Sequence, residues 1–107
     1  MAKIISSQHY IDPEIVERKM LEIANETVVH IPCYDAGIID GIEYAVQADG
    51  HHTLAAAREL EIPVVFDIAT HPEKLTGDQL LADCFMDGDW YNVETSNPYY
   101  YDFDLTF

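Results

Sequence analysis

Apolar residues recur along the chain with two different spacings. Short runs rich in β-branched residues, or with apolar and polar residues in alternation, are typical of strands, whereas apolar residues three or four positions apart are typical of amphipathic helices. The first pattern predicts strands over residues 3–6, 27–34, 42–48 and 64–68, and the second predicts helices over residues 13–25, 52–61 and 76–85, the last with Thr76 as its cap. This order of elements predicts an α/β (α+β) fold in which helices pack on a small sheet.

Local signals at the ends of these segments support the boundaries. Asp12 followed by Pro13 is typical of a helix start, because an aspartate at the N-cap accepts hydrogen bonds from free backbone N–H groups and proline suits the first helical position. Pro32 should place the end of the second strand at an edge of the sheet or at a bulge. A turn signal between Gly37 and Gly41 predicts that the second and third strands form a hairpin or a neighbouring pair.

The chain from residue 42 to residue 68 follows the order strand, glycine turn, helix, strand, which is a βαβ pattern. If its two strands run parallel in one sheet, we expect a right-handed crossover. The small side chains of residues 55–57 suit close packing of the helix on the sheet, and Pro63 ends the helix because the residue before a proline is biased away from the α conformation. The apolar run that follows predicts a buried strand.

Length and composition indicate one domain spanning residues 1–107. A chain of 107 residues leaves no room for two independent cores, and 49% hydrophobic residues suffice to build one. From about residue 87 the chain is acidic and aromatic, and its last nine residues, YYYDFDLTF, suit either a segment that packs over the core or an exposed docking strip for a partner. No apolar run approaches the roughly 20 residues that span a bilayer, and the N-terminus lacks the apolar core of a signal peptide. We therefore expect a cytoplasmic protein without a membrane partner.

The balance of charge is strongly acidic and narrows the classes of partner. Twenty Asp and Glu residues stand against five Lys and Arg, which gives a net charge of -15 at pH 7. Direct binding to nucleic acid is disfavoured, because such binding draws its affinity from basic side chains that displace counterions. Two positive alternatives remain: a basic protein attracted by the opposite potential, or a divalent cation recruited by carboxylates so that a phosphate ligand can be held. An acidic surface without any partner is the third.

The spacing of cysteines and histidines predicts no dedicated metal site. Cys33 and Cys84 lie far apart and form no CxxC pattern, so we expect both to be reduced, partly buried thiols. Neither HxH nor HExxH occurs, and the DGDW stretch at residues 87–90 lacks the further ligands of a calcium loop. The isolated histidines are expected to be structural or solvated, namely His9, His30 and His71.

The stretch DGHHT, residues 49–53, places two adjacent histidines between a glycine and the start of a predicted helix. In a functional interpretation, one imidazole contacts a phosphate and the other transfers a proton, roles that suit a pKa near neutrality. In a structural interpretation, one histidine caps the helix or bonds a carbonyl while the other faces water. Adjacent helical residues point about 100° apart, so both can line one site only at or before the first turn. Asp49 is likewise either a metal ligand or base, or a turn residue before glycine.

The segment EYAVQADGHHTLAAARELEIPVVFDI, residues 43–68, resembles the core of the ParB/sulfiredoxin-like superfamily. That core runs from a strand through a glycine-containing turn into an alanine-rich helix and a proline-led, valine-rich strand. The resemblance covers about residues 27–68 and is closest to the ParB-like nuclease branch; the turn is also similar to that of the related free-serine kinases. It implies a small mixed sheet with packed helices that binds a nucleotide or phosphorylated ligand at the start of the helix, as a phosphotransferase or nuclease.

Carried over residue by residue, the resemblance makes Gly50, His51, His52 and Thr53 the phosphate-binding residues and Asp49, His51 and His52 the catalytic candidates. Free N–H groups and the positive end of the helix dipole attract an anion there, and a nucleotide with Mg²⁺ is the expected ligand. The chain departs from the family where arginine follows the turn, since His52 and Thr53 replace a permanent charge with one that titrates near neutrality. His51 stands where sulfiredoxin has its reactive cysteine, which excludes sulfiredoxin activity.

Two hypotheses of different classes follow. The first is a ParB-like domain that binds a nucleotide or phosphorylated ligand at the DGHHT turn. The second is an acidic protein-interaction module, such as an inhibitor, an antitoxin-like factor or a DNA mimic, that uses the fold as a scaffold without catalysis. The charge of -15 is the main support for the second.

Overall fold

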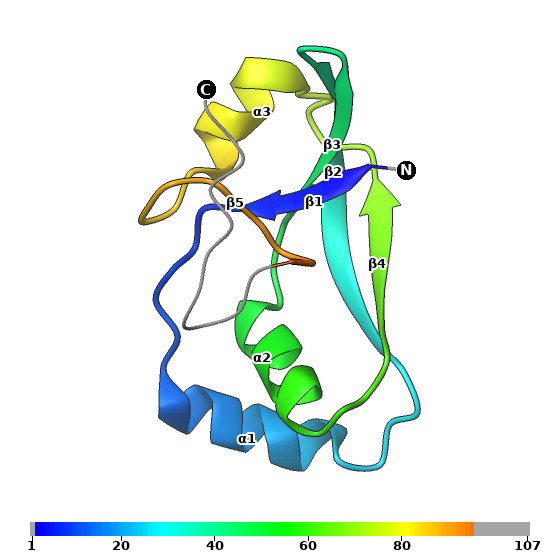
Figure 1. Ribbon diagram of the computed structural model, residues 1–107, viewed down its shortest axis with the longest axis vertical. Helices are drawn as coiled ribbons and strands as arrows, with labels where there is room; N and C mark the ends of the chain where they lie inside the picture. The colour runs from blue at the N-terminus through cyan, green and yellow to red at the C-terminus, as the bar shows by residue number, and fades with distance from the viewer. Residues whose placement is uncertain (1, 96–107) are drawn as a thin grey trace.

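A computed structural model describes residues 2–95, which form one five-stranded mixed sheet with helices packed on both of its faces (Figure 1). The elements in chain order are β1 (Lys3–Ser6), α1 (Pro13–Ile23), β2 (Val29–Ile39), β3 (Ile42–Gln47), α2 (His51–Glu59), β4 (Val64–Ala69), α3 (Gly77–Cys84) and β5 (Tyr91–Asn92). The strand order across the sheet is β4-β2-β3-β1-β5. The predicted fold class, a small mixed sheet with packed helices, is confirmed.

β2 and β3 form the hairpin that the sequence predicts, joined by Asp40 and Gly41. Both turn residues have positive φ, 51° and 81°, as the two central residues of a type I′ turn require. The predicted end of the second strand at residue 34 was wrong, because β2 continues to Ile39, with a shift in its register to β3 between Asp35 and Gly37. The carbonyl of Pro32 accepts a hydrogen bond from the N–H of Ala48, just beyond the end of β3. The proline nitrogen faces that same side, where β3 has ended, so its missing N–H interrupts no ladder.

The βαβ prediction for residues 42–68 was also wrong. β3 and β4 belong to one sheet but are separated by β2, which is antiparallel to β3 and parallel to β4. The parallel neighbour of β3 is β1 instead. The two-residue turn holds β2 on one side of β3 and β1 occupies the other, so the chain that leaves α2 pairs with the free edge of β2.

The core consists of two clusters on opposite faces of the sheet. One lies under α2 and includes Ile31, Ala45 and Leu54, and the other lies under α3 and includes Val46 and Leu80. Both faces of β3 are therefore covered from residue 44 to residue 47, although the alternation predicted a half-buried strand.

β4 was expected to be buried but lies at the edge of the sheet, where Val65 is 43% exposed and Ile68 is 47% exposed.

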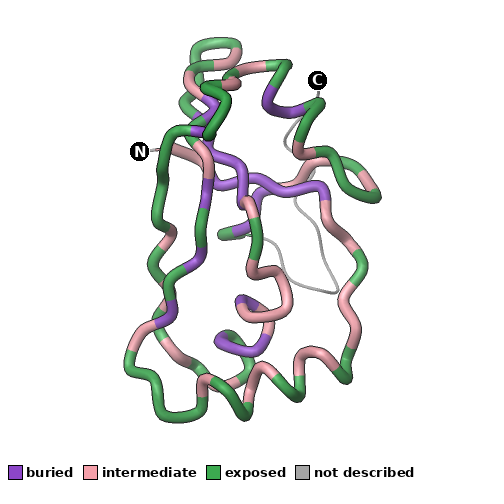
Figure 2. The backbone as a smooth tube through the Cα atoms, turned by 180° about the vertical axis from the view of Figure 1, so that it is seen from behind, coloured by how far each residue is buried: buried purple, intermediate pink, exposed green. Residues whose placement is uncertain are grey.

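α1 begins as predicted and lies outside the core. The side chain of Asp12 accepts a hydrogen bond from the N–H of Glu14, and Pro13 is the first helical residue. None of its residues is fully buried, whereas α2 buries Leu54 and two alanines (Figure 2). α1 packs against α2 at one end of the molecule, and α3 lies at the opposite end (Figure 1). α3 starts after Thr76 as predicted, but that side chain makes no capping hydrogen bond.

None of the helices in residues 2–95 combines the length and the apolarity that a membrane crossing requires. The C-terminal aromatic run YYYDFDLTF, residues 99–107, lies outside the described residues, so its packing and docking interpretations concern a part of the chain that the structure does not describe.

Candidate functional site

The turn before α2 is formed by Asp49 and Gly50. Gly50 has φ 78°, and a Cβ placed on it would lie 3.2 Å from the Cδ1 atom of Ile31, so glycine suits both the conformation and the space. The carboxylate of Asp49 is exposed and accepts a hydrogen bond from the N–H of Gly50 at 2.7 Å. Because the N-cap of α2 is a glycine, no capping side chain covers the N–H groups of its first turn. Thr53 completes that turn and is half-buried.

His51 is the first residue of α2 and reaches back to β1. Its Nε2 lies 2.8 Å from the hydroxyl of Ser6, the last residue of β1, and that hydroxyl also accepts a hydrogen bond from the N–H of Gln8. Burial lowers the pKa of His51 to about 4; neighbouring His52 acts in the same direction, and the carboxylates of Asp49 and Asp87 oppose the shift. The ring is therefore neutral at pH 7, which corrects the expectation of a pKa near neutrality for this member of the pair.

His52 faces a different segment. Its Nε2 accepts a hydrogen bond from the backbone N–H of Asp12 at 3.1 Å. An accepting Nε2 carries no proton, so the proton of the ring lies on Nδ1, which is a donor. The two histidines thus begin the first turn, as a shared site would require, but they diverge. One bonds the start of the β1–α1 connection and the other bonds its end.

A second loop, residues 86–90 between α3 and β5, holds that connection from outside. The carboxylate of Asp87 accepts hydrogen bonds from the backbone N–H groups of His9 and Tyr10, and these bonds lower its pKa. The ring of His9 lies against Gly88 so closely that a Cβ there would be 2.4 Å from it. The sequence drew attention to DGDW as a weak calcium motif, whereas the structure uses Asp87 to bind backbone N–H groups.

Ser6 and Gln47 are polar residues that the sequence analysis did not single out as part of the site. Ile5 pairs with Val46, so Ser6 and Gln47 follow at the carboxyl ends of two parallel strands. They are 2% and 4% exposed. The Nε2 of Gln47 donates to the carbonyl of Asp49 at 3.0 Å, which ties β3 to the turn before α2. A buried polar residue at the end of an apolar strand was the signal that could have found each of them.

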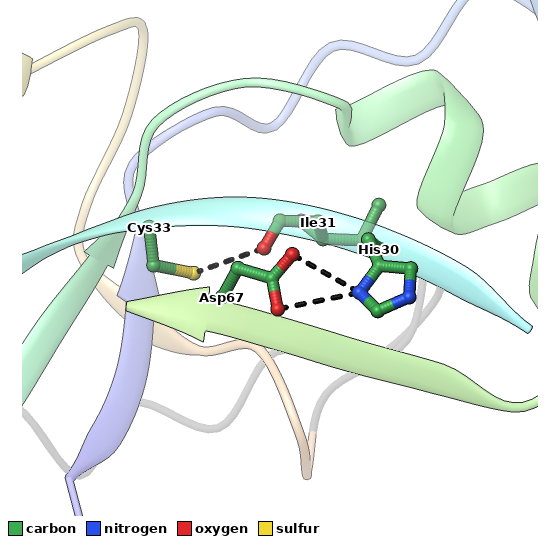
Figure 3. A network of polar contacts seen from close by, with 4 residues as sticks. All are labelled: His30, Ile31, Cys33 and Asp67. Carbon is green, nitrogen blue, oxygen red and sulfur yellow. Dashed lines mark hydrogen bonds and ion pairs between the residues drawn. The ribbon is translucent and has the colours of Figure 1, made fainter. Parts of the chain in front are cut away.

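The remaining candidates lie away from this turn. His30 and Asp67 point toward each other across β2 and β4, with 3.0 Å between Nδ1 and Oδ2 (Figure 3). His71 is buried, and its two ring nitrogens bond the N–H of Glu73 and the carboxylate of Asp83, so it is structural.

The two cysteines differ from each other in how far they are buried. The Cys33 thiol, buried beside the carbonyl of Ile31 (Figure 3), has its pKa raised to about 12 by burial and by Asp67 and Glu94. Cys84 is half-buried, and both cysteines are free, as predicted.

Within residues 2–95, no group of three or more His, Cys, Asp or Glu side chains is placed to hold a metal ion. The carboxylates of Asp49 and Asp87 both act electrostatically on His51. Both oxygens of Asp87 accept backbone N–H groups, so Asp49 is the carboxylate that could hold Mg²⁺, an ion that usually keeps several waters and takes its remaining ligands from substrate phosphates.

The turn therefore presents uncapped N–H groups, the Nδ1 donor of His52 and the exposed carboxylate of Asp49. Comparison with protein-family models, with curated proteins and with solved structures finds no match to this chain.

Proposed function

We propose that the chain binds a nucleotide or another phosphorylated ligand at the amino end of α2. The observation that carries the proposal is the uncapped first turn of α2, which begins at a glycine that lets a ligand approach the backbone. The partial positive charge of a helix N-terminus and its free N–H groups favour a phosphate there. The turn also follows the carboxyl ends of β1 and β3, the edge of a sheet where ligands of α/β proteins commonly bind.

In this proposal each residue of the turn has a separate role in binding the phosphate. The backbone N–H groups of His51, His52 and Thr53 hold the phosphate oxygens, Gly50 lets the ligand approach the backbone, and the Nδ1–H of His52 donates to one of these oxygens. The acidic surroundings oppose a bare anion, so Asp49 would hold a Mg²⁺ ion whose charge would offset that of the phosphate. Phosphoryl transfer or hydrolysis is the reaction class that fits such a ligand. His51 is a positioning residue rather than a catalytic one, because its Nε2 is already bonded to Ser6.

Calorimetric titration with ATP and with CTP, each with and without Mg²⁺, tests the proposal. We expect binding that depends on Mg²⁺, since the net charge of -15 repels the uncomplexed nucleotide. Chromatography of the nucleotide after incubation shows whether a phosphoryl group has been transferred or hydrolysed. The absence of heat with either nucleotide under both conditions would refute nucleotide binding.

Two substitutions of His52 separate its proposed ligand contact from its structural one. In His52→Gln the side-chain oxygen replaces Nε2 as acceptor for Asp12, and the Nδ1 donor is lost; in His52→Asn an N–H replaces Nδ1–H and the acceptor is lost. We expect His52→Gln to keep its melting temperature and to lose roughly tenfold in affinity. His52→Asn should melt earlier and bind like the wild type. A His52→Gln protein that binds unchanged would remove the imidazole from the site.

A second candidate function, binding of a basic protein, is favoured by the edge strand β4. Among the described residues β4 pairs only with β2, and Val65 and Ile68 are exposed on it. An exposed edge strand is a template for an added strand, and the charge of -15 selects a basic one. A peptide of alternating valine and lysine should bind more weakly at high salt and should fail to bind Ile68→Lys, whose new charge blocks the edge. Equal binding to this variant would contradict the proposal.

A further inference from the structure

The side-chain oxygen of Gln47 is an acceptor that receives no hydrogen bond from the described part of the chain, residues 2–95. Gln47 is 4% exposed, and its Oε1 is buried without a partner among residues 2–95. Buried polar groups are nearly always hydrogen-bonded, because burial removes the water that would otherwise bond them. An unfilled acceptor in such a position indicates a donor that residues 2–95 do not supply, and a bound ligand is one source of such a donor.

The orientation of this amide follows from its other contact. Nε2 donates to the carbonyl of Asp49 at 3.0 Å. Exchanging the nitrogen and the oxygen would bring two oxygen atoms together at that distance, which is unfavourable. The unpartnered atom is therefore the oxygen, and the missing partner is a donor.

The same contact locates the acceptor at the start of α2. Asp49 belongs to the turn that leads into α2, and Gln47 lies on the same face of β3 as Ala45, which packs in the cluster under α2. The acceptor thus lies beside the uncapped first turn, where the proposed function places a phosphate. A fully ionised phosphate or a sulfate has only acceptor oxygens and cannot fill it.

We propose that the ligand of this site carries an O–H group next to its anionic oxygens and donates it to Gln47 Oε1. This inference rests on the proposed function and adds a substrate class to it. Two sources supply that chemistry: the P–OH of a monoprotonated phosphate group, and a hydroxyl on the organic part of a phosphate ester. Gln47 then selects among anions that the backbone of α2 holds equally well.

Two pairs of ligands distinguish these sources. Inorganic phosphate carries a P–OH at neutral pH, whereas sulfate does not. 2-Hydroxyethyl phosphate and propyl phosphate have the same number of heavy atoms and differ by a terminal hydroxyl against a methyl group. Each is titrated, with Mg²⁺ present throughout, into the wild type, into Gln47→Met and into Gln79→Met, an exposed residue of α3 that serves as the matched control.

We expect the wild type and Gln79→Met to prefer the donor-bearing member of at least one pair by roughly tenfold, and Gln47→Met to have no preference. A preference in the phosphate–sulfate pair assigns the donor to P–OH, and one in the ester pair assigns it to the organic hydroxyl. Anions that bind without preference, or a preference that survives in Gln47→Met, would overturn this inference and leave the proposed function standing. No binding of any anion would overturn both.

If Gln47→Met does not fold, nuclear magnetic resonance of the wild type tests the same contact. The side-chain NH₂ signals of Gln47 should shift with the donor-bearing ligand and should shift less with its partner. Identical shifts for both members of each pair would also overturn the inference.

Discussion

At the scale of single residues, the polar side chains around α2 act as links between distant segments. His51 bonds Ser6, His52 bonds the backbone of Asp12, and Asp87 holds the N–H of His9; each bond joins residues at least 40 positions apart. The hydrogen bonds of His51 and His52 occupy their Nε2 atoms, which a catalytic histidine would need for proton transfer. A substitution among them therefore changes folding as well as binding, and the two effects need separate measurements.

The buried imidazole of His51 predicts a loss of stability in mild acid. Its pKa is about 4 in the folded protein, below the ordinary histidine value of 6.5, so between these pH values the unfolded chain binds a proton that the folded chain does not. The free energy of unfolding should be fully present above pH 6.5 and fall by about 2 kcal/mol toward pH 5. Urea unfolding at both pH values measures this. His51→Gln should lose about 2 kcal/mol less than the wild type over this interval; an equal loss would contradict the assignment to His51.

The two thiols should differ in reactivity. Thiolate is the reactive form, and burial together with Asp67 and Glu94 raises the pKa of Cys33 to about 12, whereas Cys84 is half-buried at the end of α3. We expect a chromogenic disulfide reagent to modify one thiol per native chain, and Cys84→Ala to remove that reaction. Modification of both thiols at similar rates in the folded protein would contradict the burial of Cys33.

At the scale of elements, predictions from short-range signals were confirmed, whereas predictions that depend on long-range strand pairing were wrong. The Asp12–Pro13 helix start and the Asp40–Gly41 hairpin form as predicted, because each depends on the backbone preferences of two adjacent residues. The partners of β4 and the length of β2 were predicted wrongly. They depend on which strand edges remain free after the hairpin and β1 have assembled.

The hairpin turn offers a test of this local control. Gly41 has φ 81° with open space around its Cα, so Gly41→Ala meets no steric clash with neighbours and changes only the backbone preference. We expect a loss of about 1 kcal/mol in the free energy of unfolding, measured by urea titration. Asp40→Asn, which tolerates positive φ equally well, serves as the control and should be nearly neutral. A neutral Gly41→Ala would mean that the turn relaxes.

At the scale of the whole molecule, the net charge of -15 acts on every element at once. Like charges on a compact chain repel each other and lower the stability of the folded state. Few ion pairs offset this within residues 2–95: Lys19 bonds Glu22 on α1, and two histidines lie beside aspartates. Added salt shortens the range of repulsion from about 10 Å at 0.1 M to about 3 Å at 1 M.

The melting temperature should therefore rise with sodium chloride concentration over this range. A double substitution of exposed acids, Glu17→Gln with Glu26→Gln, should raise the melting temperature at low salt and should narrow the gap between low and high salt. Differential scanning calorimetry measures both. A melting temperature that is unchanged or falls with salt would show that the repulsion is already relieved in the folded protein.

The candidate site was predictable in part. DGHHT was correctly predicted to form a turn and a helix start, because glycine before a run of helix formers is a local signal. The sequence did not predict that Ser6, Gln47 and Asp87 lie near this turn. They come from two strand ends and a distant loop, and single polar residues at such places form no pattern along the chain. β5 was missed for a related reason: two residues carry no periodicity.

The sequence by itself determined that α1 to α3 are helices and β1 to β4 are strands, where the hairpin turns and how acidic the chain is, because these follow from neighbouring side chains and from composition. Only the tertiary structure decided that β1 lies beside β3 and that His51 is neutral, and that, within residues 2–95, β4 is an edge strand and Gln47 Oε1 lacks a donor. Pairing, burial and pKa depend on contacts between residues far apart in the chain. The pattern of any one segment carries no information on those contacts.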